Sequence, residues 1–319
     1  MSDAPLNPRD ALRYPARRRT LQDAQFDRLR DREAARPATP GQGRFFSKFM
    51  SNRLAVAGLV IFTVIVLMSL LAPLIAQHDP KAPNLRAMLQ PPSAEHWFGT
   101  DRTGRDIFAR VLYGGQVSIL VGLGSAILSA IIGVAIGVYS GYVGGWLDWI
   151  AMRISEIFMS FPQIILVLLL VAILGQSLFN LMLIFTLTGW GGIFRMARAR
   201  MLSIREEEYV QALRSFGLGP ARIAYKHMLP NALGPIMVNI TLSTAAFILQ
   251  EAGLSFLGLG VPLSTPTWGN ILNAAQDLRL LENAWWVWLP VGVTISLFVL
   301  SVNFIGDGLR DATDPSQQG

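Results

Sequence analysis

Few residues of this sequence combine in the patterns that catalytic sites require. The three histidines, His78, His96 and His227, are far apart in the chain, and none stands in a metal-ligand spacing such as H-E-x-x-H. The sequence contains no cysteine, which excludes disulfides, thiolate metal sites and a cysteine nucleophile. The nearest approach to a nucleophile motif is Gly253-Leu-Ser255, but no histidine is near it in the sequence and no G-x-S-x-G occurs. We therefore expect no catalytic residues and no metal site. We interpret the histidines as ordinary loop residues, with His78 and His96 as ligands the alternative.

Acidic residues inside apolar runs are the next candidates for function. Glu251 is the one acid well inside such a run, and acids at membrane depth are rare and commonly functional. Glu251 is therefore a candidate for a translocation path; the alternative is a carboxyl group that faces water or a partner near the end of a span. Asp148 and Glu156 lie near the ends of predicted spans and are interpreted as solvated.

The chain has no motif for binding nucleotide phosphates. The P-loop pattern G-x-x-x-x-G-K-[S/T], whose backbone amides cradle phosphates, does not occur. The chain is therefore not expected to bind ATP through such a motif.

The composition places the chain in a membrane. Of its 319 residues, 52% are hydrophobic and 15% are charged, whereas soluble domains carry about a quarter charged residues. The apolar residues form runs of the roughly 20 residues that a helix needs to cross a bilayer core. Because these runs are continuous and do not alternate, helices are favoured over strands. We predict an all-α integral membrane protein of about six transmembrane helices.

The predicted organisation is a membrane domain between two polar tails. Residues 1–53 form a basic, proline-containing tail that ends in an interfacial segment, and we expect it to be disordered or to lie on the membrane surface. A nucleic-acid arm is disfavoured because no aromatic platform is interleaved with the charges. The membrane domain covers 54–306, and 307–319 form the C-terminal tail. The six spans are expected at about 54–76, 116–139, 157–174, 181–197, 235–257 and 286–306.

The distribution of Lys and Arg predicts that both tails are cytoplasmic. With the N-terminus inside, segments 1–53, 140–156, 195–232 and the C-terminal tail hold twelve, one, seven and one basic residues, 21 of the 27 in the chain. The opposite side holds six. Such an excess is typical of cytoplasmic segments. Three tryptophans within 285–288 suit an aromatic belt where the sixth span enters from outside.

Small residues recur every four positions along the second span. This spacing places them on one helix face, where another backbone can approach closely. We interpret the pattern as helix packing, with a pathway lining as the alternative. The residues are Ser125, Ser129, Gly133, Gly137, Gly141 and Gly145.

The segment 205–230 reads as two short helices joined by a sharp turn. Three glutamates open the first helix, where the helix dipole favours acids. Gly217 is placed to end it in a left-handed conformation, and Pro220 suits the first turn of the second helix. Pro230 would stop or kink that second helix. A rigid amphipathic hairpin would then project from the cytoplasmic face, either to dock a protein or to lie on lipid headgroups. Its apolar face would comprise Tyr209, Ala212, Leu213 and Phe216.

This segment resembles the EAA loop of bacterial ABC importer permeases. The family pattern is E-A-A, three residues, G, nine residues, I-x-L-P. The glycine and the Leu-Pro pair match it, whereas the first and third positions of the triplet and the isoleucine position depart from it. In this sequence the pattern falls on Gln211, Ala212, Leu213, Gly217, His227, Met228, Leu229 and Pro230.

Three further stretches are similar to segments of the dipeptide, oligopeptide and nickel permeases. They are HWFGTDRTGRD at 96–106, EAGLSFLGLG at 251–260 and NFIGDGLRD at 303–311. Together with the N-terminal extension they identify the chain as resembling the C-type transmembrane subunit of that family. The resemblance covers roughly residues 44–315.

The resemblance implies a type I ABC importer permease fold within a larger assembly. The implied partners are a second homologous permease subunit, two ATP-binding cassette ATPase subunits, an extracytoplasmic substrate-binding protein and membrane lipid, with no nucleic acid. The chain itself would bind no cofactor and would be a transport subunit without an ATPase site, because ATP and Mg²⁺ would be used by the partner subunits. The implied location is the bacterial cytoplasmic (inner) membrane, as a multi-pass protein. The expected cargo is a di- or oligopeptide; nickel complexes and other small solutes stay open.

The resemblance also assigns the 205–230 loop to coupling. Closure of the ATPases would move the loop as a lever and switch the spans between inward and outward access. An intramembrane enzyme and a secondary transporter are the alternatives. Secondary transporters commonly show embedded charges or broken helices in repeated halves, whereas this sequence has one candidate acid and no repeat. The implied coupling residues are Glu208, Tyr209, Gln211, Ala212, Leu213, Phe216, Gly217, Leu229 and Pro230.

Overall fold

The computed structural model describes residues 42–313. Most of the predicted basic tail, residues 1–41, and the last part of the C-terminal tail, residues 314–319, lie outside the described residues. Between 42 and 313 the chain is almost entirely helical, and its one pairing of extended residues is an isolated bridge between Thr100 and Asp106. The prediction of an all-α protein is confirmed.

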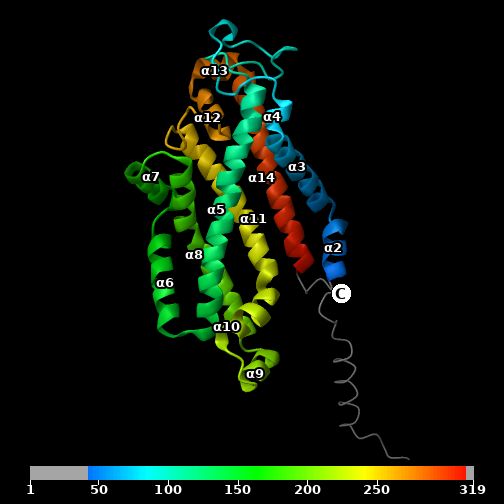
Figure 1. Ribbon diagram of the computed structural model, residues 1–319, viewed down its shortest axis with the longest axis vertical. Helices are drawn as coiled ribbons and strands as arrows, with labels where there is room; N and C mark the ends of the chain where they lie inside the picture. The colour runs from blue at the N-terminus through cyan, green and yellow to red at the C-terminus, as the bar shows by residue number, and fades with distance from the viewer. Residues whose placement is uncertain (1–41, 314–319) are drawn as a thin grey trace, which may run out of the picture. The chain divides into compact units, whose positions relative to one another are not determined.

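The helices follow one another with short connections, except for the loops between α4 and α5 and between α11 and α12 (Figure 1). In chain order they are α2 (Gln42–Ser51), α3 (Arg53–Leu70), α4 (Ala72–Ile75), η2 (Leu85–Ala87), α5 (Ile107–Val143), α6 (Gly145–Ser160), α7 (Gln163–Leu174), α8 (Leu178–Ile204), α9 (Glu208–Ser215), α10 (Pro220–Arg222), η3 (Ile223–Met228), α11 (Leu229–Phe256), α12 (Trp268–Leu272), η4 (Asn273–Gln276), α13 (Leu278–Asn283) and α14 (Trp285–Thr313).

Within the described residues, five helices are long and apolar enough to cross a membrane, or six if the bent pair α6 and α7 is one span. The two helices of this pair meet at 89°. Pro162 explains the break, because a proline disfavours the helical conformation of the residue before it, and Phe161 is extended. This break lies inside the range 157–174 expected for the third span. The prediction of about six spans is confirmed.

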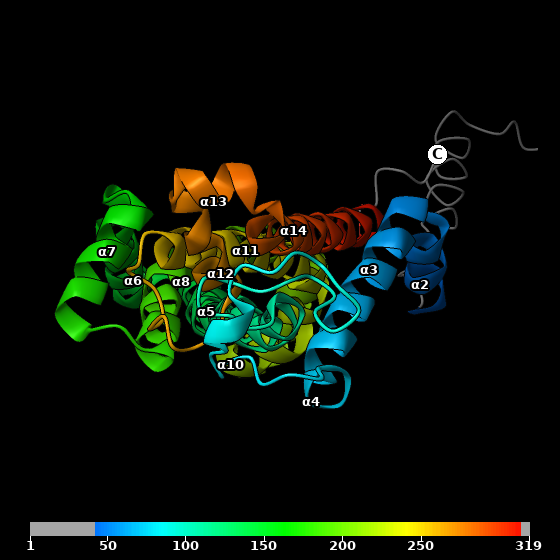
Figure 2. The same ribbon diagram turned by 90° about the horizontal axis from the view of Figure 1, so that it is seen from above.

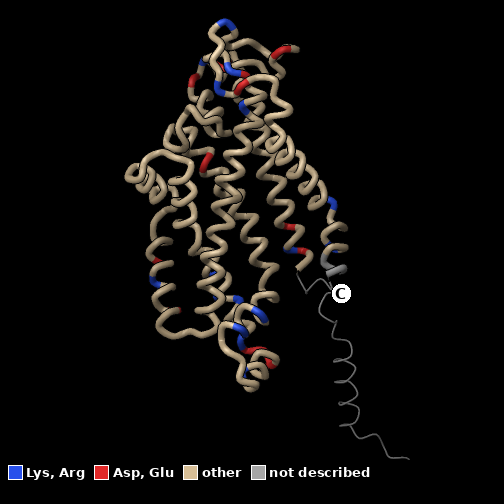
Figure 3. Tube along the Cα trace, in the orientation of Figure 1, with Lys and Arg blue, Asp and Glu red and all other residues tan. Residues whose placement is uncertain are grey.

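The long helices α5, α8, α11 and α14 lie side by side, with α3 against α14 and α6 beside α8 (Figures 1 and 2). We call the two ends of this bundle the α9 end and the α13 end. The α13 end also carries α12 and the segment 77–106. Charged residues gather at the two ends and are sparse between them (Figure 3). This distribution is what an apolar bilayer core of about 30 Å requires.

Small residues allow α5 to lie directly against α8. A Cβ atom added at Gly133 or Gly137 would stand 2.8 Å from the carbonyl oxygen of Trp190 or 2.6 Å from that of Phe194. Further along the same face, the hydroxyl of Ser129 donates to the carbonyl of Thr186 at 3.2 Å. The interpretation of this pattern as helix packing is confirmed for the residues of α5. Gly145, the last of the series, begins α6 and has no such neighbour.

The helix that contains Pro230 does not stop there. The residues from Pro220 to Phe256 run as one continuous helix in which η3 is a π-helical turn. In that turn the amide of Leu229 bonds to the carbonyl of Ala224, five residues back. The wider turn removes the steric demand that a proline makes on an α-helix, and Pro230 then sits in the first turn of α11. Of the two outcomes expected at Pro230, a stop or a kink, the stop is therefore excluded.

Candidate functional site

The α9 hairpin is closed by a glycine-dependent motif. Gly217 has φ +75°, its amide bonds to the carbonyl of Arg214 at 2.9 Å, and the amide of Leu218 bonds to that of Leu213 at 3.3 Å. This pair of bonds is a Schellman motif, which caps the last carbonyls of a helix. Pro220 opens α10 at its first turn. Both positions agree with the sequence-based expectation, and α9 projects beyond the ends of α5, α8 and α11 (Figure 1).

The buried face of α9 agrees with the expected one only in part. Val210 is fully buried and packs with Met201 of α8 and with Ile223 and Met228 of η3. Phe216 is 79% exposed, although it was placed on the apolar face. The period of 3.6 residues gives each position an angle around the helix, but it cannot show which angle the neighbouring helices cover.

The remaining residues expected to take part in coupling divide between the two sides of the hairpin. Tyr209 and Leu213 are partly buried against the Val210 cluster, as expected, and Asn231 of α11 donates a hydrogen bond of 2.9 Å to the phenol oxygen of Tyr209. Burial raises the pKa of the Tyr209 phenol above its ordinary value. Leu229 is partly buried beside the same cluster. The exposed residues of the set are Glu208, Gln211, Ala212, Phe216, Gly217 and Pro230.

An ion pair near the α9 end joins α6 to α8. Asp148 accepts two hydrogen bonds from the guanidinium of Arg198, at 2.5 Å and 2.6 Å, and 15% of its side chain is exposed. Asp148 was expected to be solvated, and the structure places it in this bidentate pair instead. Glu156 pairs with Arg153 on an open surface. The sequence separation of 50 residues between Asp148 and Arg198 explains why the pair could not be predicted.

Glu251 lies at the contact of α5, α11 and the start of α12. Its carboxyl group is fully buried and accepts hydrogen bonds from Ser118 of α5 at 2.9 Å and Ser255 of its own helix at 2.8 Å. The backbone amide of Trp268 in turn donates to the Ser118 hydroxyl at 3.1 Å. Gly269 lies so close that an added Cβ would be 2.8 Å from Ala252. In this conformation Glu251 therefore braces three elements.

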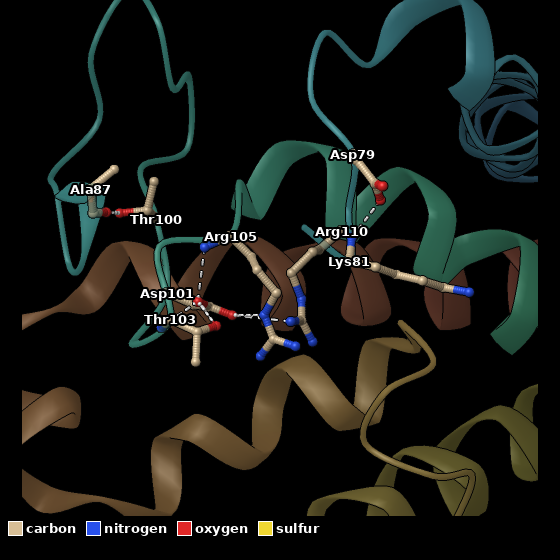
Figure 4. A network of polar contacts seen from close by, with 8 residues as sticks. All are labelled: Asp79, Lys81, Ala87, Thr100, Asp101, Thr103, Arg105 and Arg110. Carbon is tan, nitrogen blue, oxygen red and sulfur yellow. Dashed lines mark hydrogen bonds and ion pairs between the residues drawn. The ribbon is translucent and has the colours of Figure 1, made fainter. Parts of the chain in front are cut away.

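At the α13 end, Asp101 organises the segment before α5. One carboxylate oxygen accepts bonds from the amide and hydroxyl of Thr103 and from the amide of Arg105; the other accepts from the guanidinium groups of Arg105 at 2.8 Å and Arg110 at 3.0 Å (Figure 4). Burial alone would raise the pKa of Asp101, but these cations and donors outweigh it and hold the pKa below its usual value. Gly104, at φ +77°, is required because an added Cβ would collide with the carbonyl of Asn84.

Two of the three histidines come together beside this segment. The Nδ1 atom of His96 lies 2.9 Å from a carboxylate oxygen of Asp106, whose other oxygen caps α5 by accepting from the amide of Ala109. The rings of His78 and His96 are 4.6 Å apart. One ligand atom from each of His78, His96 and Asp106 lies within 4.8 Å of the others, a spacing that could hold a metal ion. Both histidines lie in a loop, as expected, and their grouping is visible only in the folded loop.

Comparison with known proteins identifies the family. The model of the binding-protein-dependent transport system inner membrane component matches residues 133–318, and the model of the N-terminal transmembrane domain of oligopeptide transport permease C matches residues 42–92. The chain belongs to this family of transport permeases. The sequence-based resemblance is confirmed, and this permease is a multi-pass protein of the inner membrane.

Relatives of the permease carry names from peptide transport. A Brucella suis protein named as a peptide permease is 45% identical over 90% of this chain and 96% of its own length. The oligopeptide transport system permease protein OppC of Bacillus subtilis is 41% identical over 84% of this chain and 87% of its own length. The dipeptide transport system permease protein DppC of the same organism is 37% identical over 95% and 96%.

The fold of the permease is that of a solved ABC transporter. An inward facing conformation of the MetNI methionine ABC transporter matches with a TM-score of 0.50 at 22% identity, over 64% of this chain and 96% of that chain. At this identity the match speaks for the fold alone. The prediction of a type I ABC importer permease fold is confirmed.

Proposed function

We propose that this permease imports di- or oligopeptides. The observation that supports a peptide as the cargo is the similarity, over most of the chain, to permeases named for peptide, oligopeptide and dipeptide transport. A second homologous permease subunit would complete the translocation path, two ATP-binding cassette ATPases would bind and hydrolyse ATP with Mg²⁺, and an extracytoplasmic substrate-binding protein would deliver the peptide. The permease would act as a transport subunit without an ATPase site or a bound cofactor of its own.

The proposed orientation has the α9 end and both tails in the cytoplasm. It rests on the excess of Lys and Arg in the segments at that end, with seven of them between 195 and 232. The basic tail 1–53 would then face the anionic lipid of the cytoplasmic leaflet, and 54–306 would form the membrane domain. Residues 307–319 would extend into the cytoplasm. The α13 end, with Asp101 and the two histidines, would face the outside.

The proposed coupling element is the α9 hairpin. Its exposed side, with Gln211, Ala212 and Phe216, would dock into an ATPase subunit. Its other side is anchored by Val210, which is fully buried among side chains of α8 and η3. Because interiors are close-packed, a displacement of α9 would be transmitted to the helices that it contacts. ATPase closure would thereby bias the permease between inward and outward access.

Glu251 is proposed to act in the same transition. The sequence made it a candidate for the translocation path. Its buried hydrogen bonds to α5 and α11, and the bond from Trp268 to Ser118, support a role in which Glu251 holds the loop before α12 in place at the outer end. Glu251→Ala would leave the hydroxyls of Ser118 and Ser255 without this acceptor and is expected to reduce uptake while the assembly persists. Uptake by reconstituted complex, with assembly measured by native mass spectrometry, tests this. Full uptake by the variant would assign Glu251 no role in transport.

The partners are tested by native mass spectrometry of the tagged permease, purified gently from its own membrane. The proposal predicts copurification with a second permease and two ATPases. The reconstituted complex, supplied with its binding protein and ATP, should then accumulate labelled dipeptide. Purification of the chain alone or as a homo-oligomer, even after cross-linking, would contradict the proposal and favour an ion-driven transporter.

A further inference from the structure

A cavity of about 290 Å³ opens at the α13 end, between the segment before α5, the α12–η4 region and the start of α14. Its size lies near the lower end for pockets that bind small molecules. One wall is apolar and includes Ile107, Ile271 and Val287. The other wall is charged. Its charged residues are Asp101, Arg102, Arg105 and Arg110.

The charged wall has more cations than its own acid can neutralise. A single oxygen of Asp101 accepts from both Arg105 and Arg110, and its other oxygen is already occupied by three local donors. Figure 4 shows the two guanidinium groups side by side on the same side of Asp101. Only 5% of the Arg110 side chain and 24% of that of Arg105 are exposed. A buried cation without a full counter-charge is costly, so the wall favours an additional anion. Arg102 adds a third positive charge, although Asp277 lies 3.5 Å from it.

Two polar atoms of the lining lack hydrogen-bond partners among residues 42–313. The Nε–H group of Arg110 is a buried donor without an acceptor, and Oδ1 of Asn270 is a buried acceptor without a donor. The amide nitrogen of Asn270 lies within hydrogen-bond distance of the carbonyl oxygens of Val261, Pro262 and Thr265, at 3.0–3.1 Å, and this fixes the orientation of the amide. Buried groups of this kind are normally paired. Two residues of the lining therefore hold one buried, unpaired donor, on a cation, and one buried, unpaired acceptor.

We propose that this cavity binds the carboxylate end of a free peptide. The guanidinium groups of Arg105 and Arg110 take the terminal carboxylate, a pairing whose charge-assisted hydrogen bonds are among the strongest in proteins. The apolar residues of the lining receive a side chain. The inference rests on the proposed function and deepens it, because it gives the permease its own contact with the cargo on the side that the proposed orientation places outside.

The test uses the complete complex of permeases and ATPases in nanodiscs, without the binding protein. Isothermal titration measures the binding of Ala-Ala and of its C-terminal amide. We expect Ala-Ala to bind about tenfold or more tightly than the amide, since the amide lacks the charge. Equal binding of the two probes, or binding of neither, would overturn the inference.

Arg105→Gln is the informative variant because it leaves the bond of 3.0 Å between Arg110 and Asp101 in place. It should weaken Ala-Ala binding about tenfold and leave binding of the amide nearly unchanged. Arg279→Gln is the matched control, since Arg279 is an exposed cation of the same end that does not line the cavity. An equal loss in both variants would overturn the inference in favour of a general surface-charge effect.

ATP-driven uptake of labelled Ala-Ala, with the binding protein present, separates the two proposals. If the wild-type complex imports no peptide, the proposed function fails. If it imports Ala-Ala but its affinity is indifferent to the carboxylate and to Arg105, the cavity inference fails while the function stands. If Arg105→Gln weakens only the docking of the binding protein, the cavity takes an acidic side chain of that protein and the inference is overturned.

Discussion

Substitution of Gly217 isolates the contribution of hairpin geometry to coupling. Gly217 has φ +75° and no atom within 4 Å of the place where a Cβ would stand, so Gly217→Val creates no clash with neighbours. The cost is that of forcing a side chain into the left-handed region, about 1–2 kcal/mol, and a β-branched residue lies at the upper end or beyond. One to two kcal/mol changes a conformational equilibrium about 5–30-fold. The turn at Gly217 should therefore lose most of its free-energy preference over other backbone conformations, in which α9 points in another direction.

The assay is ATP-driven uptake by the reconstituted complex, with ATP hydrolysis measured in parallel. Gly217→Val should abolish most uptake while the ATPase subunits remain bound or show uncoupled hydrolysis, and Gly217→Asn should retain more activity because Asn tolerates this conformation. Gly219→Val is the matched control: Gly219 is also exposed and uncrowded, but its φ of −65° suits any residue. If Gly217→Val transports as well as Gly219→Val, the hairpin geometry is not required and the lever mechanism is refuted.

Three further predictions concern stability. Gly137→Ala should lower the free energy of thermal unfolding of the solubilised permease by about 1–3 kcal/mol, because its Cβ would stand 2.6 Å from a backbone oxygen of α8. Gly192→Ala, in open space, should be neutral or mildly stabilising, and equal effects of the two substitutions would contradict close packing at Gly137. Asp148→Asn should cost about 1 kcal/mol in thermal unfolding and Glu156→Gln about 0.5 kcal/mol or less, since only the former breaks a bidentate, partly buried pair; the reverse order would refute it. The pKa of Asp101 is lowered in the folded state, so its contribution should persist above the ordinary aspartate pKa of about 3.9 and disappear as the pH falls through the folded value. The protection factors for amide hydrogen exchange in residues 84–105 should fall only in that acid range. Protection factors that rise on acidification would contradict a stabilising role of ionised Asp101.

Features that depend on local backbone chemistry could be predicted from the sequence. Gly217 adopts the left-handed conformation expected at a helix end, and Pro220 opens the next helix. The four-residue spacing of small residues identified the α5 face that packs against α8, because that periodicity is a property of the helix itself. In each case the relevant physics lies within a few residues of the motif.

Features that depend on partners distant in sequence could not be predicted. Val210 is buried and Phe216 exposed because of where η3 and α8 lie, which periodicity does not show. The grouping of His78 with His96 likewise requires the fold of the 77–106 loop. The stretch at 96–106 carried a family resemblance, but the role of Asp101 at the centre of this loop follows only from the folded structure.

Pro230 illustrates a local rule that its context overrides. A proline inside a helix normally removes a hydrogen bond and collides with the carbonyl four residues back. The π-turn of η3 immediately before it widens the helix and leaves Pro230 in the first turn of α11, where a missing N–H group is tolerated. A π-turn has no reliable signal in a single sequence, so the continuity of this helix could not be foreseen.

The most direct test of the central claim is site-specific cross-linking from α9. Because the sequence contains no cysteine, one can be introduced at Phe216, 79% exposed, without background. A reagent with one thiol-reactive and one photoreactive group should link this cysteine to an ATPase subunit in native membranes, and ATP should change the yield. A cysteine at the exposed Leu85 of the opposite end should give no such product. If Phe216→Cys labels only lipid or soluble reagents and never an ATPase, α9 does not couple this permease to ATP hydrolysis.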